Sequence, residues 1–176
     1  DKQMHEALKS ANDKLNVLSR TDGLTGIYNR RECLNALDAE FKRLQRIGER
    51  TTSTLAFLDL DKFKQINDQY GHQTGDKALV LLTERIKLTM RSNDLVGRYG
   101  GDEFLLLLRD TRDYEAQHLI NRIFTEPLIV KGERSQEIFI QCSIGMSQWH
   151  QELENIQQWI EEADRQMYHV KGNKAS

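Results

Sequence analysis

The stretch Arg98-Tyr99-Gly100-Gly101-Asp102-Glu103-Phe104 decides how this chain folds. Two glycines followed by two carboxylates stand between two apolar runs, 95–96 and 104–108. Paired glycines allow the positive φ angles of a tight hairpin turn, and the apolar runs predict its two strands. The turn would hold Asp102 and Glu103 at an exposed tip. Adjacent carboxylates repel each other, and a cation bound between them relieves that repulsion.

The spacing of apolar residues predicts helices and strands along the rest of the chain. Helices are expected where apolar residues recur every three or four positions, and strands where short apolar runs lie between polar residues. The expected helices are 1–20, 29–47, 75–90, 114–124 and 153–170, and the expected strands are 55–58, 95–96, 104–108, 128–130 and 137–143. This order predicts an α/β (α+β) sandwich with a mixed, mostly antiparallel central sheet. Its core would be a palm-like β-α-β-β-α-β unit surrounded by helices.

The N-terminal segment 1–20 has its own pattern. Its apolar positions alternate in steps of four and three, which is the seam of a short coiled coil; they are Met4, Leu8, Ala11, Leu15 and Leu18. Two interpretations stay open: a dimerising helix that continues into an upstream part, or an amphipathic helix folded onto its own domain. We expect 1–20 to be a signalling or coiled-coil helix and 21–176 to be one domain.

Composition excludes several classes of protein. The 176 residues carry a formal net charge of −2, so the strongly basic surface of a general nucleic-acid binder is absent. Cys33 and Cys142 lie too far apart for a zinc motif or a disulfide framework. No apolar run is long enough to span a bilayer, and no signal peptide is evident. We therefore expect a cytoplasmic protein, and the start at Asp1 suggests a piece of a longer chain.

A metal site is predicted where two elements meet. In a β-α-β-β-α-β core the first strand lies beside the hairpin, so Asp59 at its end would face Asp102 and Glu103. Carboxylates converging from a strand end and a turn suit Mg²⁺, which completes its shell with phosphates and water. Polymerase-like palms use such a site for in-line attack at phosphorus. Each acid taken alone would be only a solvated strand end.

The segment after this strand holds candidates for nucleotide binding. A helix start and Lys64 would attract phosphate, although a lone lysine is usually an exposed surface residue. Asn67 and Asp76 could accept hydrogen bonds from the guanine edge, or serve as turn and N-cap residues. His72 has no partner at zinc-ligand spacing, and from the residues alone a structural role is favoured.

With these residues in place, the chain resembles the GGDEF-domain diguanylate cyclases over about 18–171. Several motifs in order carry the resemblance. They are Asp22-Gly23-Leu24-Thr25-Gly26, Asn29-Arg30-Arg31, Asp59-Leu60-Asp61, Phe63-Lys64, Asn67-Asp68, Gly71-His72, Gly75-Asp76, the 98–104 stretch, Ser143-Ile144-Gly145, Ala163-Asp164, Tyr168 and Lys171.

The resemblance implies condensation of two GTP molecules into cyclic di-GMP with release of two pyrophosphates. It implies two Mg²⁺ ions per half-site, or Mn²⁺ in their place, held by Asp59, the Leu60 carbonyl, Asp102 and Glu103. Glu103 would alternatively deprotonate the attacking 3′-hydroxyl. The implied catalytic residues are Asp59, Lys64, Asp102 and Glu103, and the implied substrate-binding residues are Phe63, Lys64, Asn67, His72, Asp76, Gly100, Gly101 and Lys171. Asn67 and Asp76 would recognise guanine, and Lys64 and Lys171 would hold terminal phosphates.

The resemblance also implies partners and regulation. Each domain binds one GTP, so two copies must meet across a two-fold axis, and an upstream sensor domain would control how often they meet. Arg91 and Asp94 match the family's RxxD site for inhibitory cyclic di-GMP, although a helix-end arginine with a capping acid gives the same pattern. The chain departs from the family after Lys171, where Gly172-Asn173-Lys174 contains no arginine. Lys174 could replace that arginine only as a point charge.

Two other functions remain open. Some members of the family are non-catalytic modules that bind GTP or cyclic di-GMP, but such domains usually lose a glycine or an acid of the motif, and here all four are intact. A palm acting on nucleic acid is disfavoured by the near-neutral charge and the lack of an aromatic, basic groove.

Overall fold

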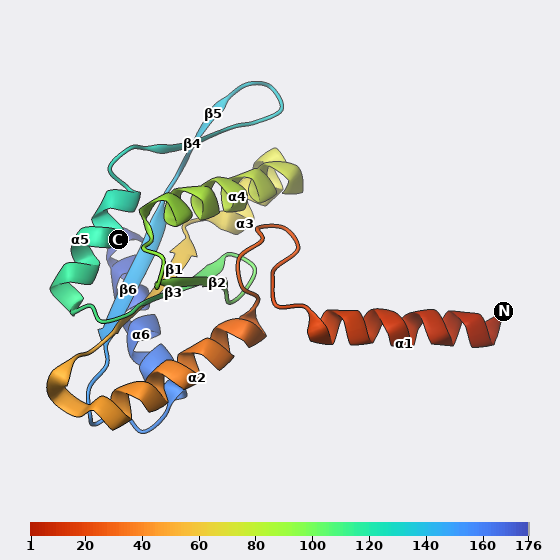
Figure 1. Cartoon of the computed structure of the whole chain (residues 1–176). Helices are drawn as coiled ribbons and strands as arrows, with labels where there is room; N and C mark the ends of the chain where they lie inside the picture. Colours follow the sequence, from red (N-terminus) through yellow and green to blue (C-terminus); the bar gives the residue numbers. More distant parts are fainter. Residues whose placement is uncertain (176) are drawn as a thin grey trace.

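A four-stranded antiparallel sheet forms the centre of the protein, for which the computed structural model describes residues 1–175 (Figure 1). The side chains of 13, 16–18 and 175 lie outside this description. In spatial order the strands are β2 (Leu95–Arg98), β3 (Glu103–Leu108), β1 (Thr54–Leu60) and β6 (Cys142–Gln148). This is the order of a β-α-β-β-α-β unit. The predicted core is confirmed, and a parallel bridge from Tyr28 to Gly97 adds to its edge.

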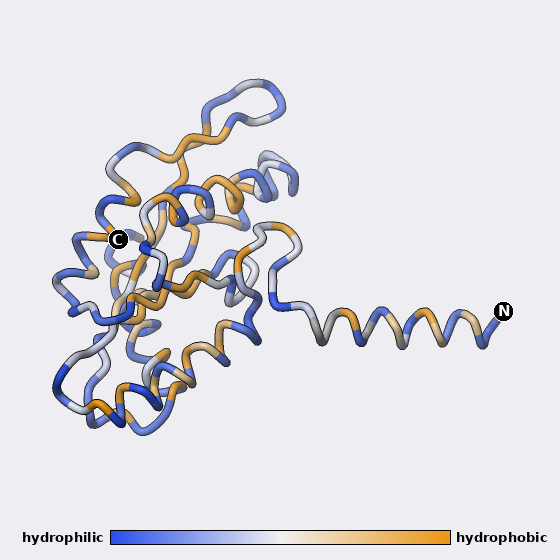
Figure 2. The backbone as a smooth tube through the Cα atoms, in the orientation of Figure 1, coloured by the Kyte–Doolittle hydropathy of each residue, from blue (hydrophilic) through white to orange (hydrophobic). Residues whose placement is uncertain are grey.

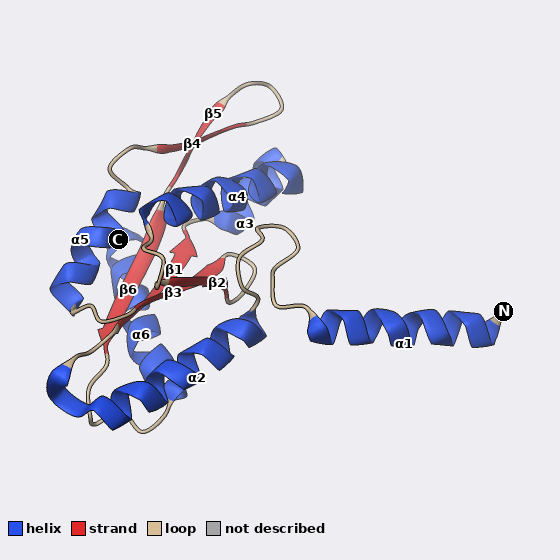
Figure 3. Cartoon of the chain, viewed as in Figure 1, coloured by secondary structure: helices blue, strands red, loops and turns tan. Residues whose placement is uncertain are grey.

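Helices cover both faces of the sheet (Figures 1 and 3). The helical segments are α1 (Lys2–Leu18), α2 (Arg30–Ile47), the short 3₁₀ turn η1 (Gly48–Arg50), α3 (Phe63–Tyr70), α4 (His72–Thr89), α5 (Asp113–Ile123) and α6 (Ile156–Ala175). Asn29 caps α2 by accepting a hydrogen bond from the Glu32 amide at 2.9 Å. Helix α4 begins before the predicted residue 75, α6 begins after the predicted residue 153, and α3 was not predicted.

Alternation along the strands divides the core into two layers. In β1, Ala56 and Leu58 join the cluster under α3, α4 and α5, whereas Leu55 and Phe57 join the cluster with α2 and α6. Because successive side chains point to opposite faces, Asp59 belongs to the face of α6. The same alternation in β3 places Glu103 on that face.

Helix α6 lies directly against β6 at one glycine. A Cβ atom on Gly145 would stand 2.0 Å from the carbonyl oxygen of Ala163 and 2.2 Å from the amide of Met167. Only a residue without a side chain allows this backbone contact. The contact fixes which face of α6 looks toward the ends of β1 and β6.

The predicted strand 137–143 is wrong as a single element. It is divided into β5 (Glu137–Ile140) and the beginning of β6, and β5 pairs with β4 (Leu128–Lys131) in a separate two-stranded sheet. Gln141 lies between the two strands, and its carbonyl accepts a hydrogen bond from the Asp61 amide at 2.8 Å. The chain therefore changes sheets at Gln141.

Helix α1 projects away from the domain (Figure 1). Met4, Leu8 and Leu15 are each about two-thirds exposed, and Figure 2 shows hydrophobic stretches alternating with hydrophilic ones along this helix. Over these positions the helix does not fold back onto its own domain. Leu18 lies outside the described side chains. No helix within residues 1–175 is both long and apolar enough to cross a bilayer.

The surroundings of both cysteines oppose formation of a thiolate. Cys33 and Cys142 are buried and unpaired, and burial raises the pKa of the Cys33 thiol to about 12. Neither is a reactive thiolate at neutral pH.

Candidate functional site

The turn between β2 and β3 differs from the predicted geometry. The amides of Tyr99 and Gly100 both donate to the carbonyl oxygen of Glu103, at 2.8 and 3.3 Å. Among residues 1–175 only Gly26, Gly48 and Gly71 are glycines with positive φ, so the expectation for Gly100 and Gly101 is wrong.

These two glycines are explained by space rather than by backbone conformation. A Cβ atom on Gly100 would lie 2.1 Å from Oε1 of Glu103, so the glycine makes room for that carboxylate. Nothing lies within 4 Å of a Cβ atom on Gly101, which leaves its backbone open for the close approach of a ligand.

An arginine braces the tip of the hairpin against the loop before α2. The Arg98 guanidinium donates to the Gly101 carbonyl at 2.7 and 3.1 Å and to the Asp22 carboxylate at 3.2 Å. Asp22 also accepts from the amide and hydroxyl of Thr25, at 2.9 and 2.7 Å. Burial raises the pKa of Asp22, but these hydrogen bonds and the Arg98 charge outweigh it and hold the pKa below its usual value. The loop 22–26 therefore fixes the turn that carries the acids.

The predicted acids meet at this end of the sheet. Asp59 and Glu103 are direct cross-strand partners in the β1–β3 register, and the Leu60 amide donates to the Asp102 carbonyl at 3.2 Å. Asp59 is only 7% exposed. The ammonium group of Lys171 in α6 donates a hydrogen bond to its Oδ2. The structure thus brings together three predicted acids, and it places Lys171 on one of them.

Burial and like charge oppose ionisation here. Burial and the neighbouring Asp59 carboxylate raise the pKa of Asp102 to about 7, because both oppose a negative charge on Asp102. Burial and the charges of Asp59 and Asp164 raise the pKa of Glu103. Burial and Asp59 also raise the pKa of Asp164. The hydrogen bond to Asp59 raises the pKa of Lys171. A cluster of acids with raised pKa values is typical of a functional site.

The donor set of this cluster fits Mg²⁺. Oδ1 of Asp59 is buried and accepts no hydrogen bond from a described residue, so it is available to a cation. Within residues 1–175 no three His, Cys, Asp or Glu side chains form a complete metal site. Mg²⁺ usually binds one or two carboxylates and takes its other ligands from phosphate and water. Asp59, Asp102 and the Leu60 carbonyl would meet that need.

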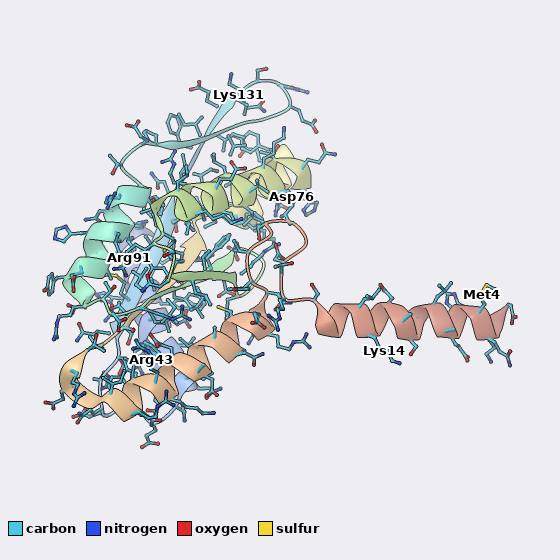
Figure 4. All side chains as sticks on the ribbon, viewed as in Figure 1. Met4, Lys14, Arg43, Asp76, Arg91 and Lys131 are labelled. Carbon is cyan, nitrogen blue, oxygen red and sulfur yellow. The ribbon has the colours of Figure 1, made fainter. Side chains whose placement is uncertain are left out.

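The predicted guanine-binding residues lie where α3 meets α4. Oδ1 of Asn67 is buried without a hydrogen-bond partner among the described residues, and a Cβ atom on Gly75 would stand 1.8 Å from it. Asp76, Lys64 and His72 are exposed, and Phe63 packs partly against the core. Figure 4 shows Asp76 on the side of the domain where Figure 1 places the hairpin turn. An orphaned amide oxygen beside an exposed carboxylate suits a ligand that donates hydrogen bonds.

The predicted inhibitory residues lie at the opposite end of β2. Figure 4 shows Arg91 on the far side of the domain from Asp76. Its guanidinium donates to both oxygens of Asp94, at 2.9 and 3.0 Å, and to the carbonyl of Arg109 at 3.1 Å. It also donates to the Thr111 hydroxyl at 2.5 Å. The Asp94 side chain is fully buried, whereas that of Arg91 is 43% exposed.

Comparison with known proteins agrees with this geometry. The family profile described as "Diguanylate cyclase, GGDEF domain" matches residues 19–176. This chain belongs to the GGDEF family.

The relatives of this GGDEF domain include enzymes and regulated assemblies. It is 33% identical over 158 residues to the probable diguanylate cyclase DgcC of Escherichia coli K12, covering 90% of this chain but 42% of DgcC. It resembles the diguanylate cyclase SiaD of Pseudomonas aeruginosa, crystallised with its activator SiaC, with a TM-score of 0.79 and 34% identity over 98% of this chain and 65% of SiaD.

A third structure covers the N-terminal helix as well. The coiled coil and GGDEF domain of DgcB from Caulobacter crescentus, in complex with c-di-GMP, has a TM-score of 0.80 and 27% identity. The match covers 98% of this chain and 91% of that one. The present chain spans less than half the length of DgcC, the curated relative above.

Two features of this GGDEF domain were not assigned from the sequence. Asp164 joins the acid cluster from α6, and its only signal was its place in the Ala163-Asp164 motif. Arg30 lies 4.2 Å over the Tyr99 ring and donates to its hydroxyl at 3.2 Å, which holds α2 against the hairpin.

Proposed function

We propose that this domain condenses two GTP molecules into cyclic di-GMP and two pyrophosphates. The observation that carries the proposal is the convergence of Asp59, Asp102 and Glu103, in which a buried Asp59 oxygen has no hydrogen-bond partner among the described residues. Family membership supports it, because a relative and two structural neighbours are described as diguanylate cyclases or as bound to c-di-GMP.

The proposed substrate site takes one GTP per domain. Asn67 and Asp76 accept hydrogen bonds from the guanine N1–H and N2–H₂ groups. The open backbone at Gly101 lets the nucleotide approach the hairpin closely, and Gly100 is assigned to the same contact. Further residues assigned to substrate are Phe63, Lys64, His72 and Lys171, with Lys64 and Lys171 on the terminal phosphates.

Asp59, the Leu60 carbonyl and Asp102 would hold Mg²⁺ or Mn²⁺, two ions per half-site, and Glu103 would serve as a further ligand or as the base. The cation supplies charge neutralisation at the phosphates. Lys171 exchanges its carboxylate partner for phosphate when the nucleotide binds. The exchange keeps Lys171 paired with an anion at every stage.

The chemical step forms one P–O bond and breaks another in each half. The 3′-hydroxyl oxygen of one GTP attacks the α-phosphorus of the other, its proton leaves toward Glu103, and pyrophosphate departs. A raised pKa makes Glu103 a better proton acceptor than an ordinary carboxylate. Two such attacks across a two-fold axis close the symmetric ring.

Dimerisation and control are assigned to the ends of the domain. We assign the exposed seam of α1 to a coiled coil that brings two domains together under an upstream sensor. The match of α1 and the domain to the coiled coil and GGDEF domain of DgcB supports this assignment. Arg91 and Asp94 are assigned to the binding of inhibitory cyclic di-GMP.

The cytoplasmic location of the protein stays a prediction.

Incubation with GTP and Mg²⁺, followed by chromatography, tests the proposed reaction. We expect cyclic di-GMP and pyrophosphate from the parent and none from Asp102→Ala. Binding of GTP or cyclic di-GMP without turnover would instead make the domain a regulatory binding module. Product on a primer strand rather than a cyclic dinucleotide would indicate a polymerase-like palm.

A further inference from the structure

The second acid of the Asp59-Leu60-Asp61 motif is bound very differently from the first. Oδ1 of Asp61 accepts from the hydroxyl of Ser143 at 2.6 Å, and Oδ2 accepts from the ammonium of Lys174 at 3.1 Å. The Asp61 amide donates to the carbonyl of Gln141 at 2.8 Å. Its side chain is only 14% exposed. Each carboxylate oxygen of Asp61 therefore already has a partner within the protein.

Asp59 shows the opposite arrangement. One of its oxygens has no partner among the described residues, and the other accepts only from Lys171. Lys171 and Lys174 stand three residues apart and therefore lie on one side of α6. The end of this helix thus contacts both acids of the motif: one oxygen of Asp59 has no partner among the described residues, whereas both oxygens of Asp61 have one.

The ammonium group of Lys174 also donates a hydrogen bond to a second acceptor. Its ammonium donates to the Cys142 carbonyl at 2.5 Å as well as to Asp61. Cys142 opens β6 and Asp61 follows β1 directly, so these bonds tie α6 to the ends of two neighbouring strands. The fully buried Ser143 adds a third hydrogen bond, which its hydroxyl donates to Asp61.

We propose that Asp61, Ser143 and Lys174 form an anchor that holds the end of α6 and thereby positions Lys171 over Asp59. Asp61 and Lys174 are positioning residues in this assignment, and neither binds metal or phosphate. The inference deepens the proposed function and rests on it for its catalytic consequence.

The physical reason for an anchor lies in the exchange required of Lys171. When metal and nucleotide reach Asp59, Lys171 must release that carboxylate and turn to phosphate. The last turn of a helix has unpaired carbonyl groups and frays readily, so a contact that breaks during the reaction cannot also hold it. The ion pair of Lys174 with Asp61, about one helical turn further on, keeps Lys171 within reach during the exchange. In this assignment Lys174 is engaged by the protein and does not take the place of the family's arginine.

A comparison of GTP with GMP binding distinguishes an anchoring role of Lys174 from direct contact with the terminal phosphates. We expect Lys174→Met to leave the ratio of GTP to GMP affinity, measured by calorimetry with Mg²⁺, within twofold of the parent. Lys171→Met should lower that ratio at least tenfold, because it removes a phosphate contact. Lys174→Met should lower kcat about tenfold with KM changed less than threefold, and Lys174→Arg should recover most of the loss. A tenfold drop of the ratio in Lys174→Met would overturn the proposal.

A double-mutant cycle tests the anchor itself. The double variant of Lys174→Met and Asp61→Asn should lower the denaturation midpoint by clearly less than the sum of the two single losses, because both changes break the same ion pair. Additive losses would contradict the anchor.

A Mg²⁺ titration tests whether Asp61 binds metal. The Mg²⁺ concentration for half-saturation should change less than threefold in Asp61→Asn but more than tenfold in Asp59→Asn, and equal changes would make Asp61 a ligand. Ser143→Ala keeps both charges and should lower kcat about threefold, even if the other variants fold poorly. If the parent makes no cyclic di-GMP, the proposed function fails, and the denaturation cycle still decides the anchor.

Discussion

The surroundings of Asp102 make its ionised form unfavourable. Burial and Asp59 raise its pKa from 3.8 to about 7, while Lys171, whose charge lowers this pKa, pairs with Asp59. Without a divalent cation, the folded state therefore holds more protons than the unfolded state between these two values. Stability then falls as the pH rises through this window, because the unfolded chain loses its proton at lower pH.

Asp102→Asn should remove this pH dependence. In thermal unfolding with a chelator, the variant and the parent should melt within about 2 °C of each other near pH 4. Near pH 8 the variant should melt at the higher temperature, because it carries no opposed charge. Added Mg²⁺ should stabilise the parent near pH 8 more than the variant. A variant that melts lower than the parent near pH 8 would show that the Asp102 charge is not opposed.

Sequence reasoning reached the acids of the site but not their partners. Asp59, Asp102 and Glu103 could be predicted to meet because strand ends and hairpin tips follow from apolar runs and glycines. Asp164 and the pairing of Lys171 with Asp59 depend on how α6 is rotated about its axis. That rotation is set by the backbone contact at Gly145, which no periodicity reveals.

At the scale of the elements, the contact of α6 with β6 can be tested by one methyl group. Gly145→Ala would bring a Cβ atom into the backbone of α6, which cannot move away as a side chain can. We expect a loss of about 3 kcal/mol in the free energy of unfolding, measured with denaturant. Gly23→Ala is the matched control, because nothing lies within 4 Å of its Cβ position, and it should change stability by less than about 0.5 kcal/mol. Equal losses in the two variants would contradict the close contact.

The far end of the β2–β3 hairpin can be tested through product binding. Arg91→Ala should abolish tight binding of cyclic di-GMP and feedback inhibition, measured by calorimetry and by initial rates with added product. It should also cost about 2 kcal/mol of stability, because the buried Asp94 loses its bidentate partner. Arg46→Ala serves as a control, because Arg46 is an exposed arginine in α2. Inhibition that persists in Arg91→Ala would remove the assignment.

Helices and strands can be predicted from the sequence where their apolar residues are regularly spaced. They cannot be separated where one continuous stretch of sequence forms two elements. The boundary between β5 and β6 falls at Gln141 inside a stretch without proline or glycine, so no turn signal marks the change of sheet. Helix α3 has only 8 residues, too few for a periodic stripe to stand out. Its left-handed start at Lys62, with φ of 57°, is set by the tertiary structure.

At the scale of the whole molecule, we expect the exposed apolar seam of α1 to affect self-association of the protein but not the stability of the domain. Deleting 1–18 should leave the melting temperature of the domain within about 2 °C, because Met4, Leu8 and Leu15 contribute little burial. It should weaken self-association and lower activity most at low protein concentration, as sedimentation and rate measurements would show. Leu8→Lys should act in the same direction, whereas Lys9→Gln beside the seam should not. Unchanged activity and concentration dependence after the deletion would contradict a dimerising role.

The separation of Arg91 from the hairpin tip has a kinetic consequence. β2 spans 95–98 between them, a length of roughly 13 Å at the usual rise of a strand. In the proposed assignment a molecule held at Arg91 leaves Asn67 and Asp76 open, so the two occupants do not compete. Excess GTP would then fail to restore the rate: the maximal velocity falls while KM stays constant, and the steady output is capped by accumulated dinucleotide whatever the nucleotide supply.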